Sequence, residues 1–193
     1  MKLSIRKKIV YTILLFLSFS FMGWVWELFY DLAKHGMLAN HGVLIGPWLP
    51  IYGSGGVLIY LILYRYKKFP TVVFMGSFVF CTIIEYVSAW YLETYNHSKW
   101  WDYSDFPFNI DGRVCLLASV FFGVIGLIGV YALIPRLKDF YDLFNFKKLT
   151  ILAFVLISIF IIDYIHSIKY PHYVVKYKII DTKKIGEIKL FKQ

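Results

Sequence analysis

The sequence predicts an all-α, polytopic membrane protein: a helix bundle of about five transmembrane helices with a short β-hairpin-like tail at the C-terminus. Of its 193 residues, 59% are hydrophobic and 21% aromatic, whereas only 17% are charged. Soluble domains are about 45–50% apolar and about 25% charged, and one soluble core of this length cannot bury so much apolar surface. The composition therefore excludes a soluble enzyme, a disordered regulator and a disulfide-stapled secreted domain.

The second observation is an excess of basic residues, which gives a formal net charge of +9. In a soluble protein such a charge would indicate nucleic-acid binding. In a chain this apolar, it is better explained by lysine and arginine at the cytoplasmic ends of membrane helices. We therefore expect the lipid bilayer as the partner, and no nucleic acid.

Four apolar runs have the length of roughly 20 residues that a membrane-spanning helix needs. The first follows a basic leader and lacks the small-residue cleavage site of a signal peptide, so we expect it to be retained. The predicted helices cover residues 9–30, 70–92, 114–135 and 149–168.

A fifth span is predicted between residues 44 and 64, where the run reaches full length only by including Pro47, Pro50 and several glycines. Proline removes a backbone donor and kinks helices. Irregular backbone at membrane depth must pack on protein or line a wet cavity. We therefore predict a kinked or re-entrant entry to this second segment, facing the protein interior.

Basic residues predict the orientation of the bundle in a cell membrane. With five spans and the N-terminus inside, the cytoplasmic basic residues are Lys2, Arg6, Lys7, Lys8, Arg65, Lys67, Lys68, Arg136, Lys138, Lys147 and Lys148, and the outer ones are Lys34, Lys99 and Arg113. Eleven against three predicts a cytoplasmic N-terminus by the positive-inside rule. The C-terminus would then lie outside, although the tail carries seven lysines.

The chain divides into a transmembrane helical domain, residues 1–168, and a basic extramembrane tail, residues 169–193. Within the tail, the β-rich runs VVKYKII and IGEIKLF are separated by four residues that can form a turn. An isolated hairpin is marginal in water. We expect it to rest on the membrane surface, on the outer loops or on a partner.

Unusual polar residues gather at the predicted outer side. Glu27 lies near the outer end of the first helix, and Glu85 lies about 22 Å along its helix from the start at residue 70. A charge buried at that depth needs a partner. The guanidinium of Arg113 suits a buried carboxylate, so we expect Glu85 and Arg113 to pair, either as a structural ion pair or as a substrate or lipid-headgroup site.

The loop before Arg113 interleaves acids with aromatic side chains. These either anchor the loop at the headgroup level as an aromatic belt or line a site. They are Asp102, Asp105, Asp111, Trp100, Trp101, Tyr103, Phe106 and Phe108.

Other polar residues carry weaker signals. Asp163 and His166 are three apart on the last helix, the spacing of a helical hydrogen-bonded pair. Neither the histidines nor Cys81 and Cys115 have the spacing of a metal site, so we expect no metal and no cofactor. The GxSxG, HExxH, P-loop and dinucleotide motifs are missing. Enzymatic activity is left open, and ATP hydrolysis by the P-loop route would need a partner.

Five motifs resemble the CmpB-type family of ABC-transporter permeases, called type IV. They are GWVWE at 23–27, NHGVLIGPWLPIYGSG at 40–55, EY at 85–86, WWDYS at 100–104 and FNIDGRVCL at 108–116. The likeness covers about residues 20–135. The sequence departs from the family at His41, where arginine is usual, and at Asp111, where asparagine is common.

The resemblance implies a permease subunit that joins a separate ATPase subunit or forms a homo-oligomer. Its motif positions, taken as substrate-binding residues at the outer half of the bundle, are Glu27, Asn40, Pro47, Tyr52, Glu85, Trp101, Asp102, Tyr103, Asn109 and Arg113. One alternative is an intramembrane enzyme acting on a lipid or lipid-linked substrate, with Glu85 or Asp102 as base and Arg113 as anion clamp. Another is a non-catalytic accessory protein whose tail adds a strand to a partner's sheet.

Overall fold

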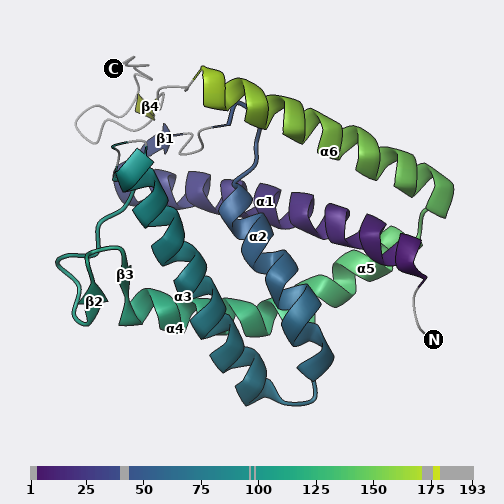
Figure 1. The fold of residues 1–193 in the computed structure, drawn as a ribbon, viewed down its shortest axis with the longest axis horizontal. Helices are drawn as coiled ribbons and strands as arrows, with labels where there is room; N and C mark the ends of the chain where they lie inside the picture. The colour runs from purple at the N-terminus through teal and green to yellow at the C-terminus, as the bar shows by residue number, and fades with distance from the viewer. Residues whose placement is uncertain (1–3, 40–43, 96, 98, 171–175, 179–193) are drawn as a thin grey trace.

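The computed structural model describes residues 4–39, 44–95, 97, 99–170 and 176–178, and it confirms the all-α bundle (Figure 1). Its elements are α1 (Ile5–His35), β1 (Met37–Ala39), α2 (Pro50–Leu58), the π-helical turn η1 (Ile59–Leu63), the 3-10 turn η2 (Tyr64–Tyr66), α3 (Pro70–Tyr95), β2 (Asn109–Ile110), β3 (Val114–Cys115), α4 (Leu116–Ile128), the π-helical turn η3 (Gly129–Leu133), α5 (Ile134–Asp142), α6 (Phe146–Lys169) and β4 (Lys176–Lys178).

Four helices among the described residues are long and apolar enough to cross a membrane: Ile5–Ala33, Pro70–Tyr95, Leu116–Asp142 and Phe146–Lys169. The predicted fifth span is shorter. Its helical part consists of α2, η1 and η2, which have nine, five and three residues. At 1.5 Å per residue this is roughly 25 Å, somewhat less than the hydrocarbon thickness of about 30 Å.

The entry to this second segment is irregular, as predicted, but its prolines do not kink a helix. Residues 44–47 form bends, residues 48 and 49 have no regular structure, and α2 begins at Pro50. Proline suits the first helical position because its missing N–H would be unpaired there anyway. Leu49 N donates to Ser20 O (3.0 Å), which ties the entry to α1. The buried glycines of α2 then pack toward the protein interior.

The fourth predicted helix continues beyond its expected end at Pro135. The run α4, η3 and α5 is unbroken from Leu116 to Asp142. Proline cannot donate to the carbonyl four residues earlier, and the π-helical turn η3 lies directly before Pro135. The wider turn accommodates this missing bond, so the helix passes the proline.

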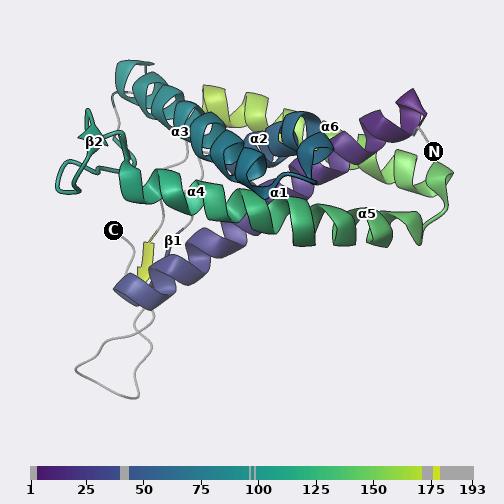
Figure 2. The same cartoon turned by 90° about the horizontal axis from the view of Figure 1, so that it is seen from below.

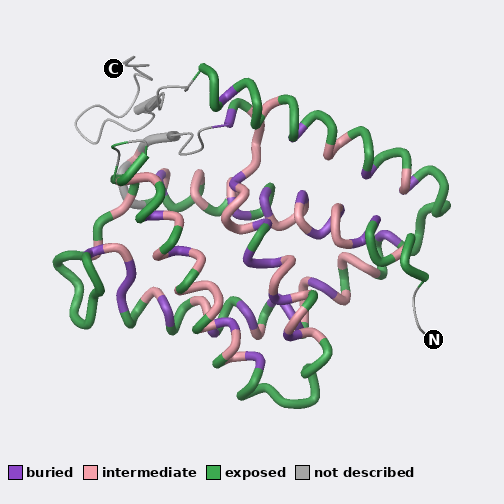
Figure 3. Tube along the Cα trace, in the orientation of Figure 1, coloured by how far each residue is buried: buried purple, intermediate pink, exposed green. Residues whose placement is uncertain are grey.

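The core lies where α1, η1, α3, η3 and α5 meet, and α6 lies along its edge (Figure 3). Leu15, Val73 and Ile134 are almost completely buried there. Contacts of α6 with the bundle include the smaller cluster of Leu17, Leu44 and Phe160. Most of the α6 surface is exposed, as expected for a helix that faces lipid.

One end of the bundle carries β1, β4, the end of α3 and the β2–β3 hairpin, whereas the N-terminus and the α5–α6 turn lie at the opposite end (Figures 1 and 2). β4 pairs with β1 in antiparallel register, Met37 opposite Lys178 and Ala39 opposite Lys176. The first run of the predicted tail hairpin therefore contains β4, which adds to the segment after α1. The second run lies outside the described residues.

Candidate functional site

The FNIDGRVCL motif folds as the hairpin β2–β3, with Asn109 opposite Cys115. Asp111 and Gly112 have φ angles of 53° and 66°, and Arg113 N donates to the carbonyl of residue 110 (2.9 Å). Asp-Gly is a preferred pair where both central residues of a hairpin turn need positive φ. This hairpin turn reverses the chain toward α3 and places Arg113 next to that helix.

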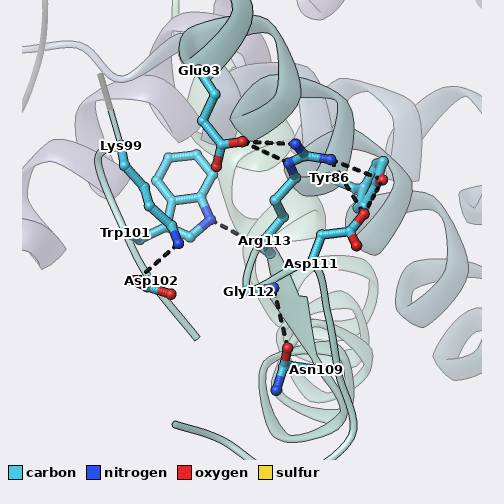
Figure 4. Close-up of polar contacts among 9 residues, drawn as sticks. All are labelled: Tyr86, Glu93, Lys99, Trp101, Asp102, Asn109, Asp111, Gly112 and Arg113. Atoms are coloured by element: carbon cyan, nitrogen blue, oxygen red, sulfur yellow. Dashed lines mark hydrogen bonds and ion pairs between the residues drawn. The ribbon is translucent and has the colours of Figure 1, made fainter. Parts of the chain in front are cut away.

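Arg113 is the centre of a polar network that we call the Arg113 hub, with Tyr86, Glu93 and Asp111 (Figure 4). Its Nε and Nη2 lie 2.8 Å from Glu93 Oε2. Its Nη1 lies 3.0 Å from Tyr86 Oη and 3.3 Å from Asp111 Oδ2. The hydrogen bond with Glu93 raises the pKa of Arg113, so the guanidinium stays charged.

The predicted pairing of Glu85 with Arg113 is wrong, because Arg113 pairs with Glu93 instead. Glu93 lies eight residues further along α3, about 12 Å nearer the end of the helix at which the hairpin sits. Arg113 therefore does pair with a carboxylate of α3, but this carboxylate is Glu93 and not the predicted Glu85.

The remaining loop residues shape the backbone around the hub. Trp101 Nε1 donates to Arg113 O (2.9 Å) and Tyr103 N donates to Gly112 O (2.7 Å). Asn109 uses its amide nitrogen for the carbonyl of Phe106 (2.8 Å) and its amide oxygen for Gly112 N (3.1 Å). Trp101 and Asn109 thus hold the loop, with no free polar group directed at a ligand.

Asp102 lies at the exposed edge of the same loop. Its Oδ2 is 2.8 Å from Lys99 Nζ, and Ser104 N donates to its Oδ1 (2.9 Å). The ammonium of Lys99 and the two donors of Ser104 lower the pKa of Asp102 to about 2. A carboxylate with so low a pKa accepts a proton only weakly, so Asp102 does not fit the role of a general base.

Below the hub lies a second group, which we call the acidic–tyrosine cluster: Glu27 of α1, Tyr52 of α2, Glu85 of α3 and Tyr103 of the loop. The Tyr52 hydroxyl donates to Glu27 Oε1, and the Tyr103 hydroxyl donates to Glu85 Oε1 (3.0 Å). Tyr52 also interacts electrostatically with Glu85 and Tyr103. Four separate elements therefore converge on one polar point.

Glu85 is the unusual member of the cluster. It is only 7% exposed, and its Oε2 has no hydrogen-bond partner among the residues that the structure describes. Burial raises the pKa of the Tyr103 phenol, and the neighbouring Glu85 carboxylate raises it further. Tyr103 therefore remains a proton donor, but it satisfies only one of the two Glu85 oxygens.

The GWVWE motif explains how Tyr52 reaches its place. A Cβ on Gly23 would lie 2.6 Å from Tyr52 Cβ, so the missing side chain makes room for the tyrosine. Glu27 is four residues further on, on the same face of α1, and receives the Tyr52 hydroxyl. The motif thus provides both the space for the ring and the acceptor for its hydroxyl.

The structure therefore separates the predicted site residues into groups. Glu27, Tyr52, Glu85 and Tyr103 form the acidic–tyrosine cluster, whereas Trp101, Asp102, Asn109 and Arg113 belong to the hub and its loop. Pro47 lies apart, in the irregular entry to α2. Asn40 lies outside the described residues, as does His41.

Sequence reasoning missed the role of Asp163. Its carboxylate accepts from Ile45 N (3.1 Å), Gly46 N (2.8 Å) and Trp48 Nε1 (2.9 Å), and from Ser167 Oγ (3.2 Å) on its own helix. It therefore fastens α6 to the entry of α2. The sequence did indicate that Asp163 has polar partners, because a carboxylate within an apolar helix needs them. Two of its four donors are backbone N–H groups, which no sequence pattern reveals.

The site offers little to a metal ion. Among the described residues, no three His, Cys, Asp or Glu side chains come together as a metal site requires. In the described part of the chain, one surface hollow is lined by residues of α3 and α4 and another by residues of α1, and neither of these includes a member of the acidic–tyrosine cluster. Tyr103 closes the cluster on the loop side.

The comparison with known families is informative. Residues 14–168 match the family described as "Putative ABC-transporter type IV". The chain belongs to this family. The match extends beyond the resemblance seen in the sequence, so the type IV family region includes α6 and its Asp163. Comparisons with curated proteins and with solved structures give no match. The family and the apolar helices together make this a multi-pass membrane protein of the ABC-transporter type.

Proposed function

We propose that this protein is the membrane-spanning permease subunit of an ABC-type transporter, and that the acidic–tyrosine cluster recognises its substrate. Substrate recognition by the cluster is supported by the state of Glu85. This carboxylate is 93% removed from solvent, and its Oε2 has no hydrogen-bond partner among the described residues. Leaving a buried carboxylate oxygen unpaired costs free energy. Such a group is retained where a ligand supplies the missing donor.

In this proposal the acidic–tyrosine cluster faces the outside of the cell and the α5–α6 turn faces the cytoplasm. The excess of basic residues on the side of the N-terminus supports this orientation. The α5–α6 turn exposes Phe140, Leu143 and Phe144 next to lysines of the same segment. An exposed apolar corner of this kind suits a protein contact, and we assign it to the separate ATPase subunit.

Native mass spectrometry of the protein, extracted gently from its own membrane, tests the assignment. We expect a stoichiometric second chain whose peptides contain a P-loop ATPase sequence. Leu143→Asn should lose this chain, whereas Phe108→Asn should keep it. Both residues are 79% exposed. Leu143 belongs to the α5–α6 turn and Phe108 directly precedes β2, two segments at opposite ends of the bundle, and asparagine tolerates the positive φ of Phe108.

One result would overturn the permease assignment: a wild-type protein that carries no ATPase chain under conditions that preserve other membrane complexes. Equal retention of the ATPase by both variants would leave that assignment standing and would overturn the α5–α6 turn as the contact. A tightly held lipid without an ATPase would favour the intramembrane enzyme instead.

A further inference from the structure

We propose that the acidic–tyrosine cluster binds a primary ammonium group, R–NH3+, of a soluble amine or of an aminophospholipid headgroup. This inference rests on the proposed role of the cluster in substrate recognition and names the substrate class. It is argued from the hydrogen-bonding balance of the cluster, its charge, and the position of Tyr103.

The cluster has more acceptors than donors. A carboxylate offers about four lone-pair sites, and the carboxylates of Glu27 and Glu85 each receive one hydroxyl from within the cluster. Glu85 Oε2 is buried and receives none from the described residues. A ligand that satisfies it must be a hydrogen-bond donor, and an ammonium group brings three donors and no acceptor.

The charge balance points the same way. The two basic side chains of the loop above the cluster are already paired, Lys99 with Asp102 (2.8 Å) and Arg113 with Glu93 (2.8 Å). Among the described residues, neither Glu27 nor Glu85 has an ion pair of its own. The cluster therefore offers two acidic groups to a cation, and it would repel an anionic ligand.

Among cations, a primary ammonium fits best. A quaternary ammonium has no N–H and would leave Glu85 Oε2 without a donor. Magnesium and calcium ions need about six or more oxygen ligands, and no three-residue metal group occurs in the described chain. Tyr52 and Tyr103 add aromatic faces, which attract ammonium groups.

Tyr103 controls access to Glu85. It is the one cluster member that comes from the loop, whereas the other three lie on helices. Its hydroxyl occupies Glu85 Oε1, and its backbone N donates to Gly112 O (2.7 Å). A ligand that displaces this hydroxyl would therefore have both oxygens of Glu85 available to it.

The experiment uses the full-length protein in nanodiscs of phosphatidylcholine. In the first arm, ethylamine and tetramethylammonium are titrated at constant ionic strength, and the apparent Kd is obtained from the shift in melting temperature. In the second arm, the nanodiscs contain equal amounts of phosphatidylethanolamine and phosphatidylcholine, and native mass spectrometry measures which of the two lipids the protein retains. The two arms distinguish a soluble amine from a lipid headgroup, since both present the same ammonium chemistry.

Glu85→Gln and Glu27→Gln remove one negative charge each while preserving the shape of the side chain. We expect each to weaken amine or headgroup binding by about tenfold or more, the effect of losing one hydrogen bond to a charged group. Asp105→Asn is the matched control. It removes an exposed acid of the same loop for which the described residues show no hydrogen bond or ion pair with the cluster, so binding should be unchanged. If Glu85→Gln does not fold, Glu27→Gln decides.

Tetramethylammonium binding as tightly as ethylamine, with no preference for phosphatidylethanolamine, would overturn the inference. Undiminished binding by the Glu27 and Glu85 variants would do the same. The result is separate from the permease assignment. Amine binding by a protein without an ATPase partner would retain this site and reject the transporter, whereas an ATPase partner without amine binding would do the reverse.

Discussion

Asp163 on α6 and Glu85 on α3 are both carboxylates within apolar helices, yet their surroundings differ. Asp163 receives four hydrogen bonds, three of them from the irregular segment before α2. Glu85 receives one, from Tyr103, and its Oε2 has no partner among the described residues. The number of donors at a carboxylate thus separates a residue that joins two elements from one that we propose as a ligand-binding residue.

The difference follows from what faces each residue. Asp163 meets a bent backbone, where Ile45 and Gly46 present N–H groups that no helix satisfies. Glu85 faces helices whose backbone donors are already used, and the one hydroxyl that it receives comes from Tyr103 of the loop. Irregular backbone within a membrane needs such satisfaction, and Asp163 provides it.

The largest effect should come from Asp163→Ala. The change leaves the N–H groups of Ile45 and Gly46 and the indole N–H of Trp48 without their acceptor, and each unpaired donor is costly. We expect a loss of about 2–4 kcal/mol of unfolding free energy, measured by reversible unfolding in mixed micelles. Ser158→Ala is the control, because Ser158 is exposed and donates only to Phe154 O of its own helix. A loss no larger than that of the control would contradict the structural role of Asp163.

The next largest effect should come from a substitution in α2, the helix whose entry is held by Asp163. A Cβ at Gly53 would lie 2.7 Å from Phe16 O, a backbone atom that cannot move aside, whereas at Gly55 it would meet only Cys81 Sγ at 3.7 Å. Gly53→Ala should therefore destabilise by about 1–3 kcal/mol, and Gly55→Ala should be neutral or stabilising by up to about 1 kcal/mol. Thermal unfolding of both variants measures this. Equal effects would mean that α2 does not approach α1 closely at Gly53.

Much of this fold could be predicted from the sequence, because apolar length and composition determine which segments form long helices. All four long runs became helices, and the irregular entry at residues 44–49 was indicated by its prolines. The extension of the fourth helix past Pro135 was not, since a π-helical turn has no distinct pattern. Nor was the pairing of β4 with β1, which depends on where α1 ends in space.

The polar residues were found by type but not by partner. Glu27, Tyr52, Glu85 and Tyr103 were singled out, and the structure brings them together from four elements. The expected pairing of Glu85 with Arg113 was wrong. Glu85 and Glu93 are eight residues apart and lie on a similar side of α3, so the sequence does not distinguish them. Their positions along the helix axis relative to Arg113 do, and Arg113 pairs with Glu93. Sequence spacing gives the face of a helix more reliably than it gives the partner.

Glu85→Gln should have a much smaller effect on stability than Asp163→Ala. Glutamine keeps a carbonyl oxygen for the Tyr103 hydroxyl, and the oxygen that becomes an amide nitrogen had no partner among the described residues. We expect a change within about 1 kcal/mol in either direction, measured by the same unfolding experiment. A loss as large as that of Asp163→Ala would show that Glu85 is a structural residue, and the distinction drawn from donor count would fail.

The smallest effect concerns Asp102, a third carboxylate, whose partners are Lys99 and Ser104. An unfolded aspartate titrates near about 3.9, whereas Lys99 and Ser104 hold the pKa of Asp102 at about 2. Because the folded pKa is the lower one, the stabilisation is complete above about pH 4 and is lost as the pH falls through 2. The Ser104 amide, which donates to Asp102 Oδ1 (2.9 Å), should report this titration by NMR, and Asp102→Asn should abolish it.

The stabilisation from Asp102 should nevertheless be slight, because its ion pair with Lys99 is exposed and screened by salt. High salt should move the Ser104 titration up toward the unfolded value, and a titration near pH 4 at low salt would contradict the contact. Asp102 and Asp163 each accept hydrogen bonds from several donors, but Asp102 is exposed to solvent and Asp163 lies between α6 and the entry to α2. Donor count therefore identifies a carboxylate that is held in place, and burial determines how much stability its contacts provide. Glu85 combines high burial with few donors, and this combination makes it the residue of the three that a ligand would most affect.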